Sequence, residues 1–288
     1  MANLKELRSR ITSVSSTMQI TSAMKMVSAA KLSKAQDAIT AMRPYSEKLS
    51  ELLQNLSATL EEGSESKLAE QREVNNVLVV AISSNRGLAG AFNTNIIKGV
   101  KKAVNERFAG KNISLYTIGK KADDILKKDF TVAKNNNEIF DKLEFDEVAA
   151  IAEDIMKAFM EGKYDKVMLV YNSFRNAATQ IVTTEQFLPI VPIDNDGDSE
   201  VSLDYDFEPE KDQIVEELIP KSLKIQLFKA LRDSFASEHG ARMTAMHKAT
   251  DNATELRDNL KLQYNKARQA SITNEILEIV GGAEALNN

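Results

Sequence analysis

The chain has 288 residues, of which 43% are hydrophobic and 27% charged, with a formal net charge of −5. This balance is typical of a folded chain and excludes wholesale disorder. The sequence holds no cysteine, which excludes disulfides, thiolate nucleophiles and cysteine-ligated metals.

The N-terminal segment, residues 1–60, is predicted to be one long helix of a coiled coil. Its apolar residues step by three and four, like the a and d positions of a heptad: Leu4, Leu7, Ile11, Val14 and Met18. Beyond them, small and flexible side chains are expected to form the stripe that a second helix contacts: Ala23, Met24, Met26, Val27, Ala29, Ala30, Ala35 and Ala38. The helix is expected to pass Pro44 and to end in the polar stretch 61–65. Because the heptad pattern starts at Leu4, we expect a mature chain without a removable leader, cytosolic in character and bacterial.

The middle of the chain, residues 75–193, alternates between strand and helix patterns. Extended segments are predicted at 77–82, 113–119, 131–133, 166–174 and 179–190, and helices at 93–108, 120–129 and 146–162. Such alternation predicts an α/β domain with a mostly parallel, Rossmann-like sheet covered by helices.

An acidic, turn-rich segment follows at 194–220, and a second long helix is predicted at 221–286, with Gly281 and Gly282 as its stop. Two long amphipathic helices that bracket a domain are expected to wind around each other, since each would otherwise expose its apolar stripe. The two charged regions differ in sign. Residues 1–48 hold eight basic and three acidic side chains, whereas 194–217 hold eleven acidic side chains and one lysine. We therefore expect them to face different partners.

Candidate chemistry is sparse. The segment SSNRGLAGAFN (83–93) follows a strand and precedes a helix, where a phosphate loop would lie, but it lacks the GxGxxG and Gly-Lys-Ser/Thr patterns. We interpret it as a tight turn rather than a nucleotide site. The two histidines, His239 and His247, lie eight positions apart on one predicted helix, which does not favour a metal site. The residues therefore predict neither a catalytic site nor a cofactor or metal.

Three segments closely resemble the γ subunit of the bacterial F-type (F1Fo) ATP synthase, the central rotor shaft. They are ITSAMKMVSAAK (20–31), SSNRGLAGAFN (83–93) and the stretch 241–286, which starts ARMTAMHKATDNA and ends ILEIVGGAEAL. The resemblance covers essentially the whole chain. The redox-regulated chloroplast form carries an inserted cysteine pair, which this chain lacks, so thiol control is excluded.

The resemblance implies that the terminal helices form an antiparallel coiled coil inside the ring of alternating α and β subunits. The middle domain would be a Rossmann-like sheet without a nucleotide, near the membrane. The positions implied to contact the ring or the partner helix are Met24, Arg86, Ala89, Arg242, Gln269, Thr273 and Glu275. The positions implied to lie in the foot, which meets the ε subunit and the c-ring, are Asp204, Tyr205, Asp206 and Glu208.

In function, the resemblance implies a non-catalytic rotating stalk. It would couple proton flow through the membrane sector to ATP synthesis or hydrolysis on the α and β subunits, and regulate ATPase activity. It would be peripheral, at the cytoplasmic face of the inner membrane, with no nucleic-acid partner. The residues leave two other classes open: a soluble coiled-coil tether that presents an α/β ligand-binding module, and a stand-alone Rossmann-type enzyme.

Overall fold

The computed structural model describes residues 4–59, 67–190 and 211–286. The chain divides into two compact units, one made of Met1–Ser28 with Met243–Asn288 and the other of Ala29–Arg242. Two long helices, α1 (Leu4–Thr59) and α5 (Lys211–Leu286), contribute residues to both units. Each unit is described by itself.

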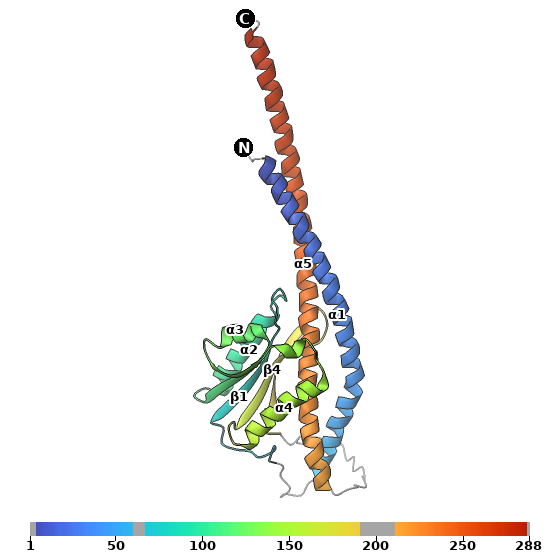
Figure 1. The fold of residues 1–288 in the computed structure, drawn as a ribbon, viewed down its shortest axis with the longest axis vertical. Helices are drawn as coiled ribbons and strands as arrows, with labels where there is room; N and C mark the ends of the chain where they lie inside the picture. The colour runs from blue at the N-terminus through green and yellow to red at the C-terminus, as the bar shows by residue number, and fades with distance from the viewer. Residues whose placement is uncertain (1–3, 60–66, 191–210, 287–288) are drawn as a thin grey trace. The chain divides into compact units, whose positions relative to one another are not determined.

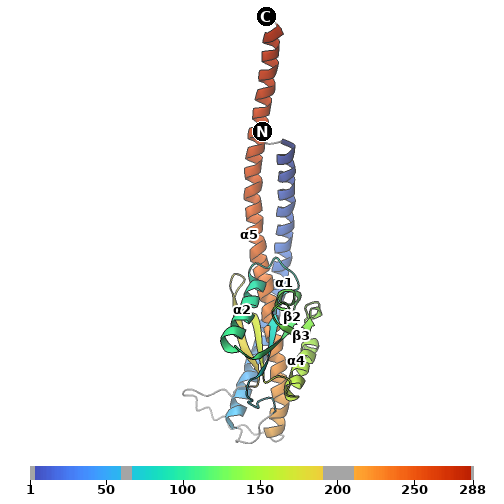
Figure 2. The same cartoon turned by 90° about the vertical axis from the view of Figure 1, so that its left-hand side faces the viewer.

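The first unit is a pair of antiparallel helices, in which α1 and α5 run side by side (Figure 2). The Thr250 hydroxyl on α5 donates a hydrogen bond to the Thr21 hydroxyl on α1 at 2.8 Å. Farther along α5, the Arg257 guanidinium lies 3.3 Å from the Met18 sulfur. Because residue numbers rise along α5 as they fall along α1, the two helices are antiparallel, as expected.

The seam of this pair keeps a spacing of seven residues. Its buried members are Leu7, Thr21 and Ser28 on α1 and Met246, Ala253 and Leu260 on α5. The predicted seam at Leu4–Met18 is confirmed, because each of its five residues is buried or half-buried. The stripe predicted beyond it is partly wrong, since the side chains of Ala23, Met26, Val27 and Ala30 are exposed. A helix that keeps the heptad period presents one face to its partner, so Thr21 and Ser28 occupy the seam there although they are polar.

The second unit contains a five-stranded sheet in the order β3-β2-β1-β4-β5. Its elements are β1 (Asn76–Ile82), α2 (Phe92–Arg107), β2 (Asn112–Ile118), α3 (Lys120–Leu126), β3 (Thr131–Asn136), the 3-10 turn η1 (Glu138–Phe140), α4 (Phe145–Met160), β4 (Lys166–Phe174) and β5 (Gln180–Leu188). The first four strands are parallel, and β5 pairs antiparallel with β4. This arrangement confirms the mostly parallel α/β sheet.

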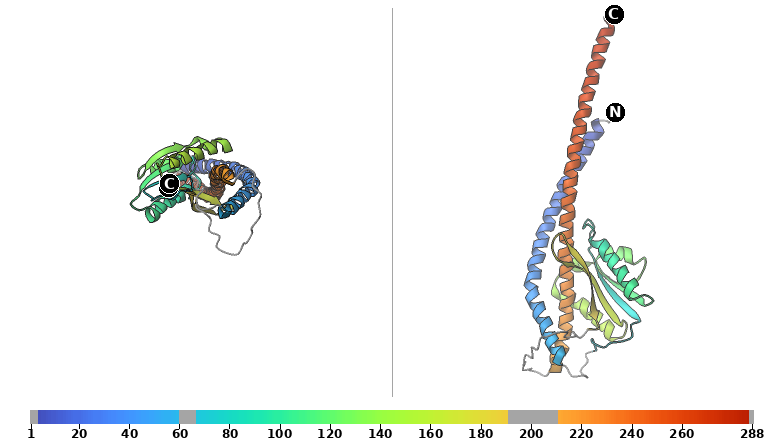
Figure 3. Two further views of the ribbon diagram at one scale, coloured as in Figure 1. Left: turned by 90° about the horizontal axis from the view of Figure 1, so that it is seen from below. Right: turned by 180° about the vertical axis from the view of Figure 1, so that it is seen from behind.

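Helices cover both faces of the sheet, and successive residues of β1 separate the two cores. Val77, Val79 and Ala81 pack with α2 and α3. Leu78, Val80 and Ile82 pack with α4 and with the start of α5. Figures 1 and 3 show α2 and α4 on opposite faces of the sheet. A strand buried on both faces reads as a continuous apolar run, and this is why VLVVAI identified β1 from sequence.

The ends of α5 differ from the prediction. It begins at Lys211 rather than Lys221, so part of the predicted turn-rich segment 194–220 is helical, and Pro220 lies inside the helix. Proline removes one helical hydrogen bond, but burial of Ile219 and Leu223 in the core opposes that loss. At the other end the helix passes Gly281 and Gly282 without stopping. Glycine weakens a helix by about 1 kcal/mol but keeps its hydrogen-bond donor.

Candidate functional site

The loop that follows β1 lies where a parallel sheet of this kind would bind a ligand. The chain leaves β1 towards β2 on one side, whereas β4 lies on the other side of β1. Ligands of open α/β sheets bind in the crevice at such a switch point, beyond the carboxyl ends of the strands. The loop at residues 83–93 borders this crevice.

Two polar side chains of the loop, those of Ser84 and Asn93, are bonded within the loop itself. The backbone N–H of Ser84 donates to the Asn93 side-chain oxygen at 3.0 Å, and the Ser84 hydroxyl donates to the Arg86 carbonyl at 2.7 Å. The Asn93 amide nitrogen donates to the Ser84 hydroxyl at 2.8 Å. These bonds hold the two ends of the loop together, as expected of a tight turn.

The loop also occupies the N-terminus of α3, which in a nucleotide-binding protein is a natural anion site. Its first three backbone N–H groups, from Lys120, Lys121 and Ala122, donate to the Asn85 side-chain oxygen, the Ser84 carbonyl and the Ser83 hydroxyl, at distances of 3.1, 3.0 and 2.9 Å. The first three backbone donors of α3 are therefore used within the protein.

Helix α5 fills the crevice. The Ser237 hydroxyl donates to the Asn172 carbonyl at 3.0 Å, and Ala241 packs against Ala89 and Phe92. At Gly240, an added Cβ would lie 3.1 Å from the Ala177 Cα, so glycine permits this close approach. The geometry makes the crevice a docking site for the chain's own helix.

Arg242 fastens the loop to α5. One nitrogen of its guanidinium donates to the Arg86 and Gly87 carbonyls at 3.2 and 3.3 Å. Another donates to the Glu238 carboxylate at 2.6 Å, and both side chains are about nine-tenths buried. Charge-assisted bonds to two consecutive carbonyls restrain the backbone at the tip of the loop.

Burial shapes the electrostatics beneath the loop. It raises the pKa of Glu238, although the Arg242 guanidinium acts in the opposite direction. Burial, with smaller effects from Arg242 and Lys31, lowers the pKa of His239 to about 4. The imidazole packs edge-on against the Phe235 ring, with centroids 4.5 Å apart. His239 is therefore a neutral core residue near pH 7.

The loop residues implied by the resemblance differ in accessibility. The Arg86 side chain is exposed, and Leu88 is 66% exposed in a left-handed conformation with φ of 61°. Ala89 is only 1% exposed. The exposed residues of the loop are thus Arg86, Gly87, Leu88, Gly90 and Ala91, whereas Ala89 is buried.

The remaining implied contacts lie in the helical pair. Met24 is half-buried on α1, whereas Gln269, Thr273 and Glu275 are exposed on α5. The Thr273 hydroxyl donates to the Gln269 carbonyl at 2.9 Å. From Ile272 to Ala283 every side chain of α5 is exposed, including a set of large apolar ones: Ile272, Ile276, Leu277, Ile279 and Val280.

One residue of the site, Glu238, was not among the contacts that the resemblance implies. Glu238 was not singled out from sequence, although its spacing of four from Arg242 on a helix was a usable signal. The foot residues Asp204, Tyr205, Asp206 and Glu208 lie outside the described residues. Among residues 4–59, 67–190 and 211–286, no helix is long and apolar enough to cross a membrane.

Comparisons with known proteins agree on one family. The family model described as ATP synthase matches residues 3–286. The ATP synthase gamma chain of Christiangramia forsetii is 74% identical over 287 residues, covering 100% of both chains. That of Flavobacterium psychrophilum is 68% identical over 286 residues, covering 99% of both.

Solved structures share the fold. A chain from the rotor of the Euglena gracilis mitochondrial ATP synthase superposes with a TM-score of 0.68 at 23% identity, covering 93% of this chain and 98% of that one. A chain from the central stalk and c-ring of the Tetrahymena thermophila mitochondrial ATP synthase has a TM-score of 0.60 at 26% identity, covering 80% of this chain and 99% of that one. With full-length relatives this similar, the chain belongs to the ATP synthase gamma chain family.

Proposed function

We propose that this chain is the rotating central stalk of a bacterial F-type ATP synthase. It couples proton flow through the membrane sector to ATP synthesis or hydrolysis on the ring of α and β subunits, and it regulates that ATPase activity. The observation that carries the proposal is the antiparallel helix pair, whose buried residues recur at intervals of seven along each helix. Two helices wound around each other resist bending and unwinding better than one.

The energetics explain why such a shaft is needed. A few protons crossing a potential of ~150–200 mV release on the order of 10–15 kcal/mol, at ~2.3 kcal/mol per charge per 100 mV. Rotation of a stiff, asymmetric rod carries this energy to remote sites. Each face of the rod stabilises a different conformation of the β subunit it meets, so that turning the rod shifts the three conformational equilibria in sequence.

The shaft itself is non-catalytic in this proposal. The switch-point crevice is filled by α5, and the loop after β1 uses its polar groups internally. The shaft contacts the ring of α and β subunits through Met24, Arg86, Gln269, Thr273 and Glu275. Arg242 and Ala89 contribute by holding the backbone of the loop at residues 83–93 in place. Through its partners the chain lies at the cytoplasmic face of the inner membrane.

Locking the shaft to the ring tests the proposal. Leu88→Cys is suited to this, because the side chain is exposed and the chain has no cysteine of its own. A second cysteine is placed in the loop of β that faces Leu88, and the bridge is formed by oxidation. A disulfide needs Cα atoms within about 7 Å, so it holds the shaft in one orientation.

A turning shaft must then stop, so ATP hydrolysis should fall in proportion to the cross-linked fraction and recover on reduction. The buried Ala89→Cys variant is the matched control for cysteine in the same loop, and it should cross-link poorly. Full hydrolysis with the Leu88 bridge completely formed would show that the chain is a passive tether.

The foot is proposed to attach the shaft to the membrane sector and to ε. In this proposal, basic groups of the c-ring bind the carboxylates of Asp204, Asp206 and Glu208. Tyr205, which follows Asp204 in the sequence, belongs to the same contact segment. Reversing the three charges should release the soluble sector from washed membranes, most strongly at low salt, while ATP hydrolysis by the released sector persists. Wild-type retention of that sector would show that the acidic run is only a solvated surface.

A further inference from the structure

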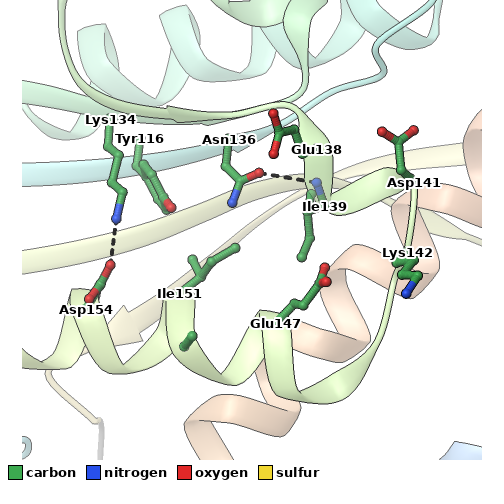
Figure 4. Close-up of a pocket in the computed structure, with 11 residues that line it drawn as sticks. Tyr116, Lys134, Asn136, Glu138, Ile139, Asp141, Lys142, Glu147, Ile151 and Asp154 are labelled. Carbon is green, nitrogen blue, oxygen red and sulfur yellow. Dashed lines mark hydrogen bonds and ion pairs between the residues drawn. The ribbon is translucent and has the colours of Figure 1, made fainter.

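Two adjoining hollows lie between the edge strand β3 and helix α4. The larger has a volume of about 620 Å³ and the smaller about 150 Å³. Tyr116, Lys134 and Asp154 line both, so the two hollows adjoin at the Lys134–Asp154 ion pair, and we call them together the β3–α4 groove. Figure 4 shows the larger hollow, with β3 and η1 on one side and α4 on the other.

One wall of the groove is an open sheet edge. β3 is the last strand on its side of the sheet, and within the described residues it pairs only with β2. An edge strand offers unpaired backbone N–H and C=O groups to any extended chain that lies beside it. A groove between an edge strand and a helix is the geometry in which proteins bind peptides by strand addition.

A buried hydroxyl lies in the wall of the groove. Tyr116 is only 3% exposed, and its hydroxyl has no hydrogen-bond partner with suitable geometry in the described structure. In Figure 4 it points into the space beside Asn136 and Ile151. Burial raises its pKa, which Lys134 and Asn136 partly oppose, so the hydroxyl keeps its proton near pH 7. An unpaired buried hydroxyl destabilises the folded state, and an incoming acceptor would remove this cost.

The charges and size of the groove define what fits. The larger hollow is lined by three carboxylates, those of Glu138, Asp141 and Glu147, and by the Lys142 ammonium. Lys134 also lines it, but its charge is already paired with Asp154 at 2.6 Å. The lining therefore carries an excess of negative charge. The smaller hollow has apolar walls formed by Leu78, Ile155, Ala158 and Tyr164. Glu147 and Ala158 are about 16 Å apart along α4 at ~1.5 Å per residue. An extended chain spans that distance in about five residues.

We propose that the β3–α4 groove binds an extended segment of a partner protein, which adds to β3 as a sixth strand. The segment places a lysine or arginine among Glu138, Asp141 and Glu147, and an apolar side chain in the smaller hollow. One of its carbonyls accepts the Tyr116 hydroxyl. The inference rests on the proposed function, because the partner is taken to be another subunit of the same assembly.

Hydrogen exchange in the purified complex tests the groove. We expect the β3 amides that point away from β2 to exchange at least tenfold more slowly in the complex than in the isolated full-length chain, because the added strand bonds them. Tyr116→Phe removes the hydroxyl and Glu147→Lys reverses one charge, and each should reduce this protection severalfold. Glu106→Lys makes the same charge change on α2 beside the opposite edge of the sheet, and should leave the protection intact.

A photo-cross-linker identifies the occupant. Ala150 is exposed on α4 and lines the groove, so the Ala150→Cys variant is labelled there with a benzophenone and assembled into the complex. Asn105→Cys, at an exposed position on α2, carries the same label as the control. We expect an adduct in one extended segment that contains a lysine or arginine. An adduct on a helix, or no protein adduct, overturns the proposal, as does unprotected β3 in an intact complex. Failure of the complex to assemble would instead contradict the proposed function.

Discussion

The guanidinium of Arg242 and the carboxylate of Glu238 form an ion pair at 2.6 Å, one turn apart on α5 and almost entirely removed from water. The same guanidinium bonds to the carbonyls of Arg86 and Gly87. The pair therefore joins α5 to the loop at residues 83–93. A charge that is buried and loses its partner is strongly destabilising, whereas removal of both charges is tolerated far better.

Arg242→Gln should lower the free energy of unfolding by about 3–5 kcal/mol, because it leaves the Glu238 carboxylate buried without a countercharge. The double variant Arg242→Gln, Glu238→Gln should cost less than the sum of the two single changes. Urea unfolding of the full-length chain measures both. Arg268→Gln, at an exposed position on α5, is the control. Additive costs would show that the two side chains are not coupled.

Gly119 should tolerate no side chain. It has a φ of +99°, and an added Cβ would collide with the Ser83 carbonyl. We expect Gly119→Ala to destabilise the protein by more than about 3 kcal/mol, from backbone strain and the collision together. Gly110 has a φ of +78° with open space around it, so Gly110→Ala should cost only about 1 kcal/mol. Equal unfolding midpoints for the two variants would contradict this account.

His239 should make the protein sensitive to acid. Its folded pKa of about 4 lies below the ordinary 6.5, so between these values the unfolded chain binds a proton that the folded chain does not. Stability from this residue is present above pH 6.5 and is lost as the pH falls towards 4, by up to about 3 kcal/mol. The raised pKa of Glu238 acts in the opposite direction, because the folded carboxyl then binds its proton more readily.

The pH dependence is measured by urea unfolding of wild type and His239→Gln between pH 7 and 4. The variant should lose less stability over this range than wild type. His247→Gln, in which an exposed imidazole is removed, is the matched control. Parallel curves for wild type and His239→Gln would refute the assignment of the acid sensitivity to this buried imidazole.

Met24→Lys should impair the coupling of proton transport to ATP turnover without preventing assembly of the ATP synthase. Met24 is half-buried on α1, so the new ammonium would remain partly accessible to the surrounding ring. A charge-assisted bond to one β subunit, worth ~1.5–3 kcal/mol, would stabilise one rotary state and slow passage through it. Proton pumping per ATP in membrane vesicles is the measurement, with Met24→Leu as the apolar control. Unchanged pumping in the lysine variant would count against the proposal.

Sequence patterns identified the strands and the helical seam because their signals are local. The run VLVVAI needs both faces buried, and the steps from Leu4 to Met18 need one helical face buried, whatever the partner is. The segments 20–31, 83–93 and 241–286 also carried enough family likeness to indicate the rotor shaft. Local rules placed the start of α5 wrongly, because the burial of Ile219 and Leu223 outweighs the helix-breaking tendency of Pro220.

The functional details of the loop depended on residues that are far apart in the chain. Sequence showed a Gly-containing turn at 83–93, but only tertiary contacts place Ala241 on Ala89 and bring Arg242 to the Arg86 carbonyl. Likewise, nothing local indicates that β3 is an edge strand or that the Tyr116 hydroxyl is buried beside α4. Such features arise from the order of strands and from side-chain packing across elements, which no periodicity within a single segment encodes.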